Sequence, residues 1–180
     1  MRSRSRLATA VVAAGLVFTT FATPAGAAKQ ELGPRVKIKG AALPDADETI
    51  GSADDPAIGR TPPTLVGEGF NGKPVTVAHT EGTPRMVLFL SHSCPHCQAE
   101  VPVLVKLAKQ GKLDGLEVDT ISTNASESLP NYPPSKWLKR ERWPFKPVLA
   151  DDARLRALLA YGGTAFPYFV FIGADGTVAI

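Results

Sequence analysis

Two cysteines stand three positions apart in an apolar segment, and this pair constrains the fold and chemistry of the chain more than any other feature. Residues 88–102 read LFLSHSCPHCQAEVP and hold Cys94 and Cys97, the only cysteines of the 180 residues, with His92 and His96 beside them. A disulfide within the pair would enclose only two residues, which removes little entropy from the unfolded chain. A redox couple or a metal site therefore explains the pair better than a structural bridge does.

Residues 1–27 have the order of a secretory signal peptide. Three arginines precede an uncharged, alanine-rich run at residues 7–21, and small residues follow at 25–27. We predict cleavage near Ala27, with an uncleaved membrane anchor as the alternative. A lipid anchor is disfavoured because no cysteine follows directly after the run. Export would place the cysteines in a periplasmic or other extracytoplasmic space, where disulfides persist.

The charge of the chain gives no sign of a nucleic-acid partner. Lys and Arg number 20 against 17 Asp and Glu. Removing residues 1–27 takes away three arginines and no acid, which leaves 17 residues of each sign and no net charge. The basic excess belongs to the export signal, and we expect no binding to nucleic acid.

The remainder of the chain predicts a tether and one α/β domain. Residues 28–57 are polar, contain three X-Pro steps and lack a sustained hydrophobic period, which predicts a flexible tether. Residues 58–180 are enough for a single domain with its own core. The domain is expected to contain a strand at 86–91, a helix from Pro95 to about Gln110 and a strand at 116–122, joined by a right-handed crossover. The helix face that should turn inward carries Cys97, Val101, Leu104 and Ala108.

Two shorter helices and a hairpin are predicted in the last third of the chain. Ser135 is expected to cap a helix that runs to Arg142. Asp151 is expected to cap another that ends at Gly162, with Leu155, Leu158 and Leu159 as its apolar stripe. Residues 168–172 and 177–180 predict a hairpin about the Asp-Gly pair at 175–176.

Cys94 is the expected nucleophile of the pair. It lies where the strand ends and the helix begins, so unpaired backbone N–H groups and the helix dipole favour its thiolate form. A protonated His96 would act in the same direction. Cys97, one helical turn further on, would resolve a mixed disulfide between Cys94 and a substrate cysteine. Glu100 is a candidate for proton transfer at Cys97, although a solvated acid near the helix start explains this residue equally well.

With the cysteines in a strand-to-helix turn, the chain resembles the thioredoxin superfamily, most closely the exported TlpA/ResA-like thiol-disulfide oxidoreductases of the redoxin, or AhpC/TSA, group. The resemblance covers residues 58–180. IGRTPPTL is similar to the opening segment of that group, NGKPVTV to its hairpin, and RMVLFLSHSCPHCQAEVPVL to its active-site strand and helix, with Pro102 at the usual helix kink. It implies a thioredoxin-like three-layer α/β/α sandwich with a mixed central sheet. It also implies an enzyme that exchanges disulfides with exported protein thiols, needs no cofactor, and works with a membrane electron donor or acceptor.

The same resemblance assigns a substrate-binding role to a proline far along the chain. In YGGTAFPYFVFIGADGTV, Pro167 stands where the family has a cis-proline facing the dithiol. Phe166 and Pro167 are then expected to present backbone groups to an extended substrate segment.

The chain departs from the family pattern at three places. Ser93 replaces a tryptophan common before the first cysteine, and Leu88 replaces a buried carboxylate that accepts a proton from the second thiol. Proton transfer from Cys97 would then use water, His96 or Glu100. The sequence also ends inside the last expected strand, so the family's final helix is expected to be missing.

The sequence is compatible with two other functions and with either direction of electron flow. A redoxin-type peroxidase would use Cys94 against peroxide, but Val87 stands where peroxiredoxins have a proline. A non-enzymatic copper or zinc protein would need more ligands than the two thiols, and neither His92 nor His79 has a spacing that supports a metal site. The overall pattern resembles exported reductases, whereas the Pro95-His96 pair between the cysteines is that of DsbA-like oxidases.

Overall fold

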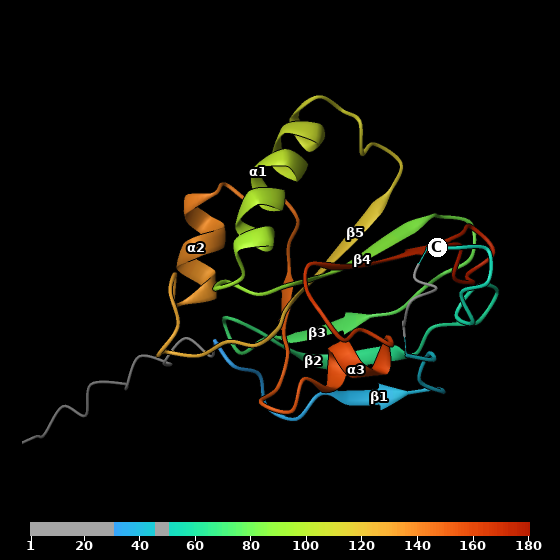
Figure 1. Cartoon of the computed structure of the whole chain (residues 1–180), viewed down its shortest axis with the longest axis horizontal. Coiled ribbons are helices and arrows are strands. Elements are labelled where there is room, and N and C mark those ends of the chain that lie inside the picture. The colour runs from blue at the N-terminus through green and yellow to red at the C-terminus, as the bar shows by residue number, and fades with distance from the viewer. Residues whose placement is uncertain (1–30, 46–50) are drawn as a thin grey trace, which may run out of the picture.

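A mixed sheet of seven strands is the frame of the computed structural model, which describes residues 31–45 and 51–180 (Figure 1). The strands are β1 (Lys37–Lys39), β2 (Thr64–Gly69), β3 (Pro74–Val77), β4 (Arg85–Leu90), β5 (Glu117–Ser122), β6 (Val148–Ala150) and β7 (Tyr168–Ile172). The helices are α1 (Pro95–Lys109), α2 (Pro134–Arg140) and α3 (Arg156–Ala160). The order across the sheet is β1-β2-β6-β5-β4-β7, and β3 pairs with β2.

The predicted crossover unit is present at the centre of the sheet. β4 pairs in parallel with β5, so that Leu90 lies opposite Ser122, and it pairs antiparallel with β7 on its other edge. All six residues of β4 are buried, as an apolar run flanked by strands on both edges and packed on both faces requires. Since α1 connects β4 to β5, its first residues lie at the carboxyl end of β4.

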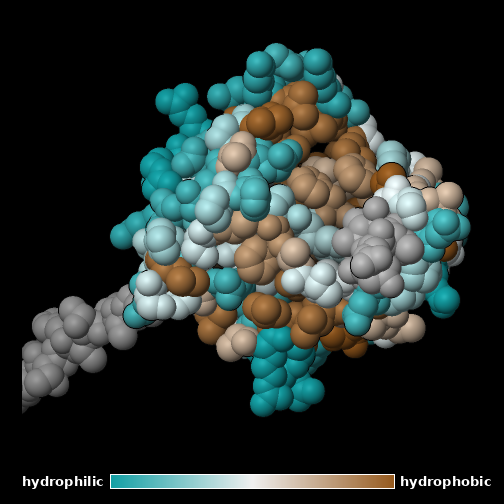
Figure 2. All heavy atoms as spheres, viewed as in Figure 1, coloured by the Kyte–Doolittle hydropathy of each residue, from teal (hydrophilic) through white to brown (hydrophobic). Residues whose placement is uncertain are grey.

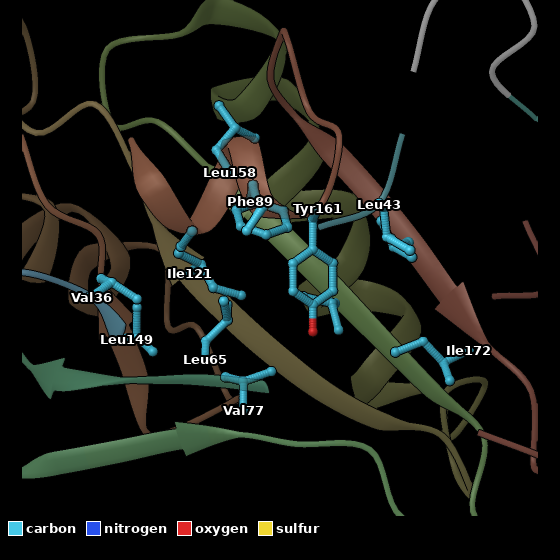
Figure 3. Packing of buried hydrophobic residues seen from close by; sticks show 14 of the residues in the cluster. Val36, Leu43, Leu65, Val77, Phe89, Ile121, Leu149, Leu158, Tyr161 and Ile172 are labelled. Carbon is cyan, nitrogen blue, oxygen red and sulfur yellow. The ribbon is translucent and has the colours of Figure 1, made fainter. Parts of the chain in front are cut away.

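Alternate residues of β4 supply two separate cores, which confirms the three-layer α/β/α arrangement. Met86, Leu88 and Leu90 pack with residues of α1 and α2, which lie side by side on one face of the sheet. Val87 and Phe89 face the other side and pack with α3. Figure 3 shows this second core, with side chains of Val36, Leu43, Leu65, Val77, Phe89, Ile121, Leu149, Leu158, Tyr161 and Ile172. Figure 2, in the same view as Figure 1, shows apolar residues across the middle of the visible surface and many hydrophilic ones toward its margins.

The flexible tether predicted for residues 28–57 is wrong for residues 31–45, which pack onto the domain. β1 pairs antiparallel with β2, and Val36 and Leu43 are 1% and 4% exposed. The buried Glu31 carboxylate accepts hydrogen bonds from the Ser135 N–H (3.0 Å) and hydroxyl (2.5 Å). These partners are distant in sequence, so local periodicity gave no sign of them. The predicted signal peptide, residues 1–27, lies outside the described residues.

Replacing Leu43 with alanine tests whether this segment is part of the folded domain. Because the Leu43 side chain is buried in the core that packs with α3, its truncation should lower the free energy of unfolding by about 2–4 kcal/mol. Urea denaturation measures this value. Leu32→Ala is the matched control, because Leu32 is 38% exposed and should change the value by less than about 0.5 kcal/mol. Equally small effects from both variants would favour a flexible tether.

The predicted helix caps also differ from the structure. Pro133 is the N-cap of α2, and Ser135 lies inside the first turn, where it binds Glu31 instead of capping the helix. α3 begins only at Arg156, and Leu159, which was expected in its apolar stripe, is exposed. The Asp151 carboxylate nevertheless accepts hydrogen bonds from the N–H groups of Ala157 (2.9 Å) and Leu158 (3.3 Å). It satisfies the first turn of α3 from outside the helix.

The C-terminal hairpin is only partly regular. The turn forms where predicted, with Gly176 at φ +79°, and the Gly173 N–H donates to the Thr177 carbonyl (2.8 Å). Residues 177–180 form no strand, and a single bridge joins Val178 to Ile172. Gly162, where the helix was predicted to end, lies just beyond α3 and has φ +74°. Within the described ranges, no helix is both long and apolar enough to span a bilayer.

Candidate active site

Cys94 is the N-cap residue of α1, at the carboxyl end of β4. Its backbone is extended (φ −76°, ψ 122°), its carbonyl accepts the first helical hydrogen bond from the Gln98 N–H (3.0 Å), and Pro95 is the first helical residue. Proline fits there because its missing N–H would have no helical partner. The partly exposed thiol of Cys94 donates a hydrogen bond to the Phe166 carbonyl oxygen at 3.2 Å. Both cysteines are free thiols, so the geometry is that of the reduced protein.

Cys97 lies one turn further along α1 and is fully buried. Its side chain packs into the core between α1 and the sheet, with Leu88 in the same cluster. Burial raises the pKa of the Cys97 thiol to about 12; the adjacent Cys94 adds to this shift, and the Ser91 N–H that points at Sγ (3.4 Å) opposes it. Cys97 is therefore a neutral thiol near pH 7, whereas Cys94 is the sulfur that a large reactant can reach.

Phe166 lies against Cys94 although the two residues are distant in sequence. The Phe166-Pro167 peptide bond is cis, and it immediately precedes β7, the edge strand that pairs with β4. Because β7 runs antiparallel to β4, its beginning lies beside the end of β4, where Cys94 is. The structure thus brings together Cys94 and Phe166, two residues that the sequence assigned to one site.

The residues expected to move protons are less closely associated with the thiols. His96 is exposed and Glu100 is half-buried on α1; in the described part of the chain, the thiols form hydrogen bonds with Phe166 and Ser91 and with neither of these side chains. Leu88 is fully buried between Phe169 and Thr120 of the neighbouring strands, so the position holds no base. The roles of His96 and Glu100 stay predictions.

The described residues contain no cluster of three or more His, Cys, Asp or Glu side chains that could bind a metal ion. His79 lies near Gly176, at the turn after β7. It comes from the segment that follows β3, and the thiols follow β4. The candidate site therefore consists of the two thiols and the backbone groups of Ser91 and Phe166 that contact them.

His92 is the site residue whose setting the sequence did not reveal. It was expected to be an ordinary surface or strand-end residue, but its side chain is 0% exposed. Its Nδ1 contacts the Pro130 carbonyl (2.6 Å), and its Nε2 accepts a hydrogen bond from the Ser126 N–H (3.2 Å). The one feature of the sequence that could have indicated its burial is its position just after the apolar run of β4.

Comparison with known proteins supports thiol-disulfide chemistry. The model of the AhpC/TSA family matches residues 58–180. The thiol-disulfide oxidoreductase ResA of Halalkalibacterium halodurans is 27% identical over 133 residues, which cover 74% of this chain and 69% of ResA. A thioredoxin-family thiol:disulfide interchange protein of Chlorobium tepidum is 30% identical, with a TM-score of 0.52 over 66% of this chain and 81% of that one. A secreted disulfide oxidoreductase of Mycobacterium tuberculosis, homologous to DsbE of E. coli, is 26% identical, with a TM-score of 0.52 over 63% and 79% of the two chains.

Proposed function

The chain belongs to the AhpC/TSA family as a TlpA/ResA-like thiol-disulfide oxidoreductase with a thioredoxin-like fold, and from this premise we propose that Cys94 and Cys97 are its redox-active couple. The observation that carries the proposal is the difference between the two sulfurs. Cys94 is partly exposed at the start of α1, and Cys97 is buried one turn further on. A disulfide exchange needs one accessible thiol to attack and a second nearby thiol to resolve.

The proposed reaction moves two electrons between the couple and a protein disulfide. The Cys94 thiolate attacks one sulfur of the substrate disulfide; a mixed disulfide forms, and the other substrate sulfur leaves as a thiolate that takes a proton from water. Cys97 then loses its proton and attacks Sγ of Cys94, which breaks the mixed disulfide and releases the second substrate thiol. The substrate is reduced, and Cys94 and Cys97 are oxidised to a disulfide. The reverse sequence oxidises a substrate dithiol.

The surroundings of the couple suggest how each step is assisted. The Phe166 carbonyl lies 3.2 Å from Sγ of Cys94, so we assign Phe166 and Pro167 to the backbone surface that receives an extended substrate. Cys97 has to lose its proton as it attacks, because its raised pKa of about 12 keeps it protonated beforehand. Since Leu88 provides no base, water, His96 or Glu100 would take this proton.

The proposal extends to exported substrates and a membrane redox partner. The signal-like residues 1–27 support export, and one of the similar proteins is described as secreted. The identity of the proteins that a Cys97→Ser variant captures is the test of this extension: exported proteins are expected, and a set of cytosolic proteins would contradict it. The peroxidase and metal-carrier alternatives are not favoured by the relatives, which are thiol-disulfide oxidoreductases.

Measurement of the reduction potential tests the couple and its direction together. Equilibration with glutathione buffers should yield an intramolecular Cys94–Cys97 disulfide, seen as a loss of two hydrogens by mass spectrometry. A potential near about −270 mV, as in thioredoxin, would indicate a reductase, and one near about −120 mV, as in DsbA, a disulfide donor. Cys94→Ser is the control that cannot form this disulfide. Failure of the wild-type protein to form it in any buffer would contradict the proposal.

A further inference from the structure

The buried ring of His92 joins the active-site turn to the loop that follows β5. This loop, residues 124–133, is called the β5–α2 loop below. Its Ser126 N–H donates to Nε2 of His92, so Nε2 carries a lone pair and the ring hydrogen is on Nδ1, which donates to the Pro130 carbonyl. The Tyr132 ring packs edge-on against the imidazole, with 5.8 Å between ring centroids. The loop thus holds the imidazole at three points, and both ring nitrogens have loop partners.

The topology of the sheet places this loop beside the nucleophile. β4 and β5 are parallel neighbours, and the Thr123 N–H donates to the Leu90 carbonyl (2.9 Å), so the β5–α2 loop and the turn carrying Cys94 leave the same edge of the sheet. His92 lies two residues before Cys94, and its carbonyl accepts a hydrogen bond from the Gln98 side chain (3.1 Å) of α1. The imidazole therefore links the β5–α2 loop to a turn that α1 also holds.

The loop has little regular structure that would fix it without His92. No helix or strand occurs within residues 124–133, and Asn124 and Asn131 both adopt positive φ (52° and 62°). Glu127, Ser128 and Pro130 are exposed on the loop surface. A segment of this kind changes shape readily when its attachment is lost, because few backbone hydrogen bonds resist the change.

We propose that His92 is a positioning residue that holds the β5–α2 loop as one wall of the surface on which polypeptide substrates bind beside Cys94. The inference rests on the proposed function of the dithiol and adds a substrate-binding element to it. Phe166 and Pro167 lie on the β7 side of Cys94, and the β5–α2 loop lies on the β5 side, so a substrate segment longer than the disulfide itself meets both. A small disulfide reaches Cys94 without contacting the loop.

The test compares a disulfide-bonded peptide with an uncharged small disulfide, bis(2-hydroxyethyl) disulfide. Single-turnover oxidation of the reduced enzyme gives a half-saturation concentration and a limiting rate for each. His92→Phe keeps an aromatic ring but loses both hydrogen bonds, and we expect it to raise the half-saturation concentration for the peptide by about tenfold. The rate with the small disulfide should fall much less than the peptide reaction does, because this disulfide does not depend on the loop. His92→Asn retains a donor near Nδ1 and His92→Gln an acceptor near Nε2, so each should recover part of the loss.

Two further variants keep the proposal testable if the buried substitutions impair folding. Glu127→Lys changes an exposed residue of the loop, and it should raise the half-saturation concentration for a lysine-rich peptide disulfide several-fold through charge repulsion. Tyr132→Phe removes only a hydroxyl that contacts Glu127 (3.5 Å), retains the ring against His92, and should match wild type with an uncharged peptide. An unchanged half-saturation concentration for the lysine-rich peptide in Glu127→Lys, or for the uncharged peptide in folded His92→Phe, would overturn the role of the loop. Wild-type enzyme that reacts with neither disulfide would instead overturn the proposed function.

Discussion

A Cys97→Ser variant is expected to accumulate as a mixed disulfide with its substrates through Cys94. Cys94 is partly exposed at the first turn of α1 and can still attack a substrate disulfide. Without the buried second thiol, nothing inside the protein attacks Sγ of Cys94, so the complex persists until an external thiol reduces it. Non-reducing electrophoresis with mass spectrometry of the linked peptides measures the trapped fraction, and turnover should fall by roughly a thousandfold or more.

The matched control for the trap is Cys94→Ser. This variant keeps Cys97, but that thiol is buried and protonated, so it should capture no substrate. Turnover should be lost to the same extent as in Cys97→Ser, although no complex accumulates. Equal trapping by the two variants would contradict the assignment of attacking and resolving roles.

The active-site unit could be predicted from the sequence because each of its determinants is local. The apolar run of β4 identifies a strand buried on both faces, Pro95 fixes the first turn of α1, and the three-residue spacing places Cys97 on the inward face. These features depend on residues within one helical turn or one strand of each other. The contact of Cys94 with Phe166 could be predicted only from the family resemblance, since 72 residues separate the two.

The elements that the sequence missed are held by partners distant in the chain. β1 has only three residues, too few for a hydrophobic period, and it exists because β2 pairs with it. Glu31 lies in the segment predicted as a tether, and its hydrogen-bond partner, Ser135, is 104 residues away. His92 is similarly defined by Ser126 and Pro130, 34 and 38 residues further on. Such side chains have no local pattern, because their environment is created by tertiary packing.

The packing of Leu88 in the same apolar cluster as Cys97 affects the step in which Cys97 resolves the mixed disulfide. A leucine in the core next to the second thiol stabilises the packing of α1 on the sheet, but it leaves Cys97 without a buried base. The same burial that raises the pKa of Cys97 to about 12 keeps this sulfur unreactive until a mixed disulfide has formed. Reactivity is thereby concentrated on Cys94, the sulfur that substrates can reach.

Alkylation of the reduced Cys94→Ser variant should show this protection of Cys97 directly. Because burial raises the pKa of Cys97 from the ordinary 9.0 to about 12, its thiolate fraction near pH 7.5 is about a thousandfold lower than that of an ordinary cysteine. The thiolate is the reacting form, so iodoacetamide should modify the native variant on the order of a hundredfold to a thousandfold more slowly than the urea-unfolded variant. Removal of Cys94 lessens the shift, but burial, its largest cause, remains.

The pH dependence of this reaction has a definite sign. The folded protein holds the Cys97 proton more tightly than the unfolded chain does. The resulting contribution to the free energy of unfolding is fully present below pH 9 and is lost as the pH rises toward about 12. The rate of native alkylation should therefore rise by about tenfold per pH unit up to about pH 12, whereas the rate of the unfolded control should level off above its ordinary pKa of 9.0. Mass spectrometry of samples quenched with acid measures both rates. Rapid modification of the native variant at pH 7.5 would show that Cys97 is accessible as a thiolate, and it would remove the physical basis for assigning attack to Cys94 alone.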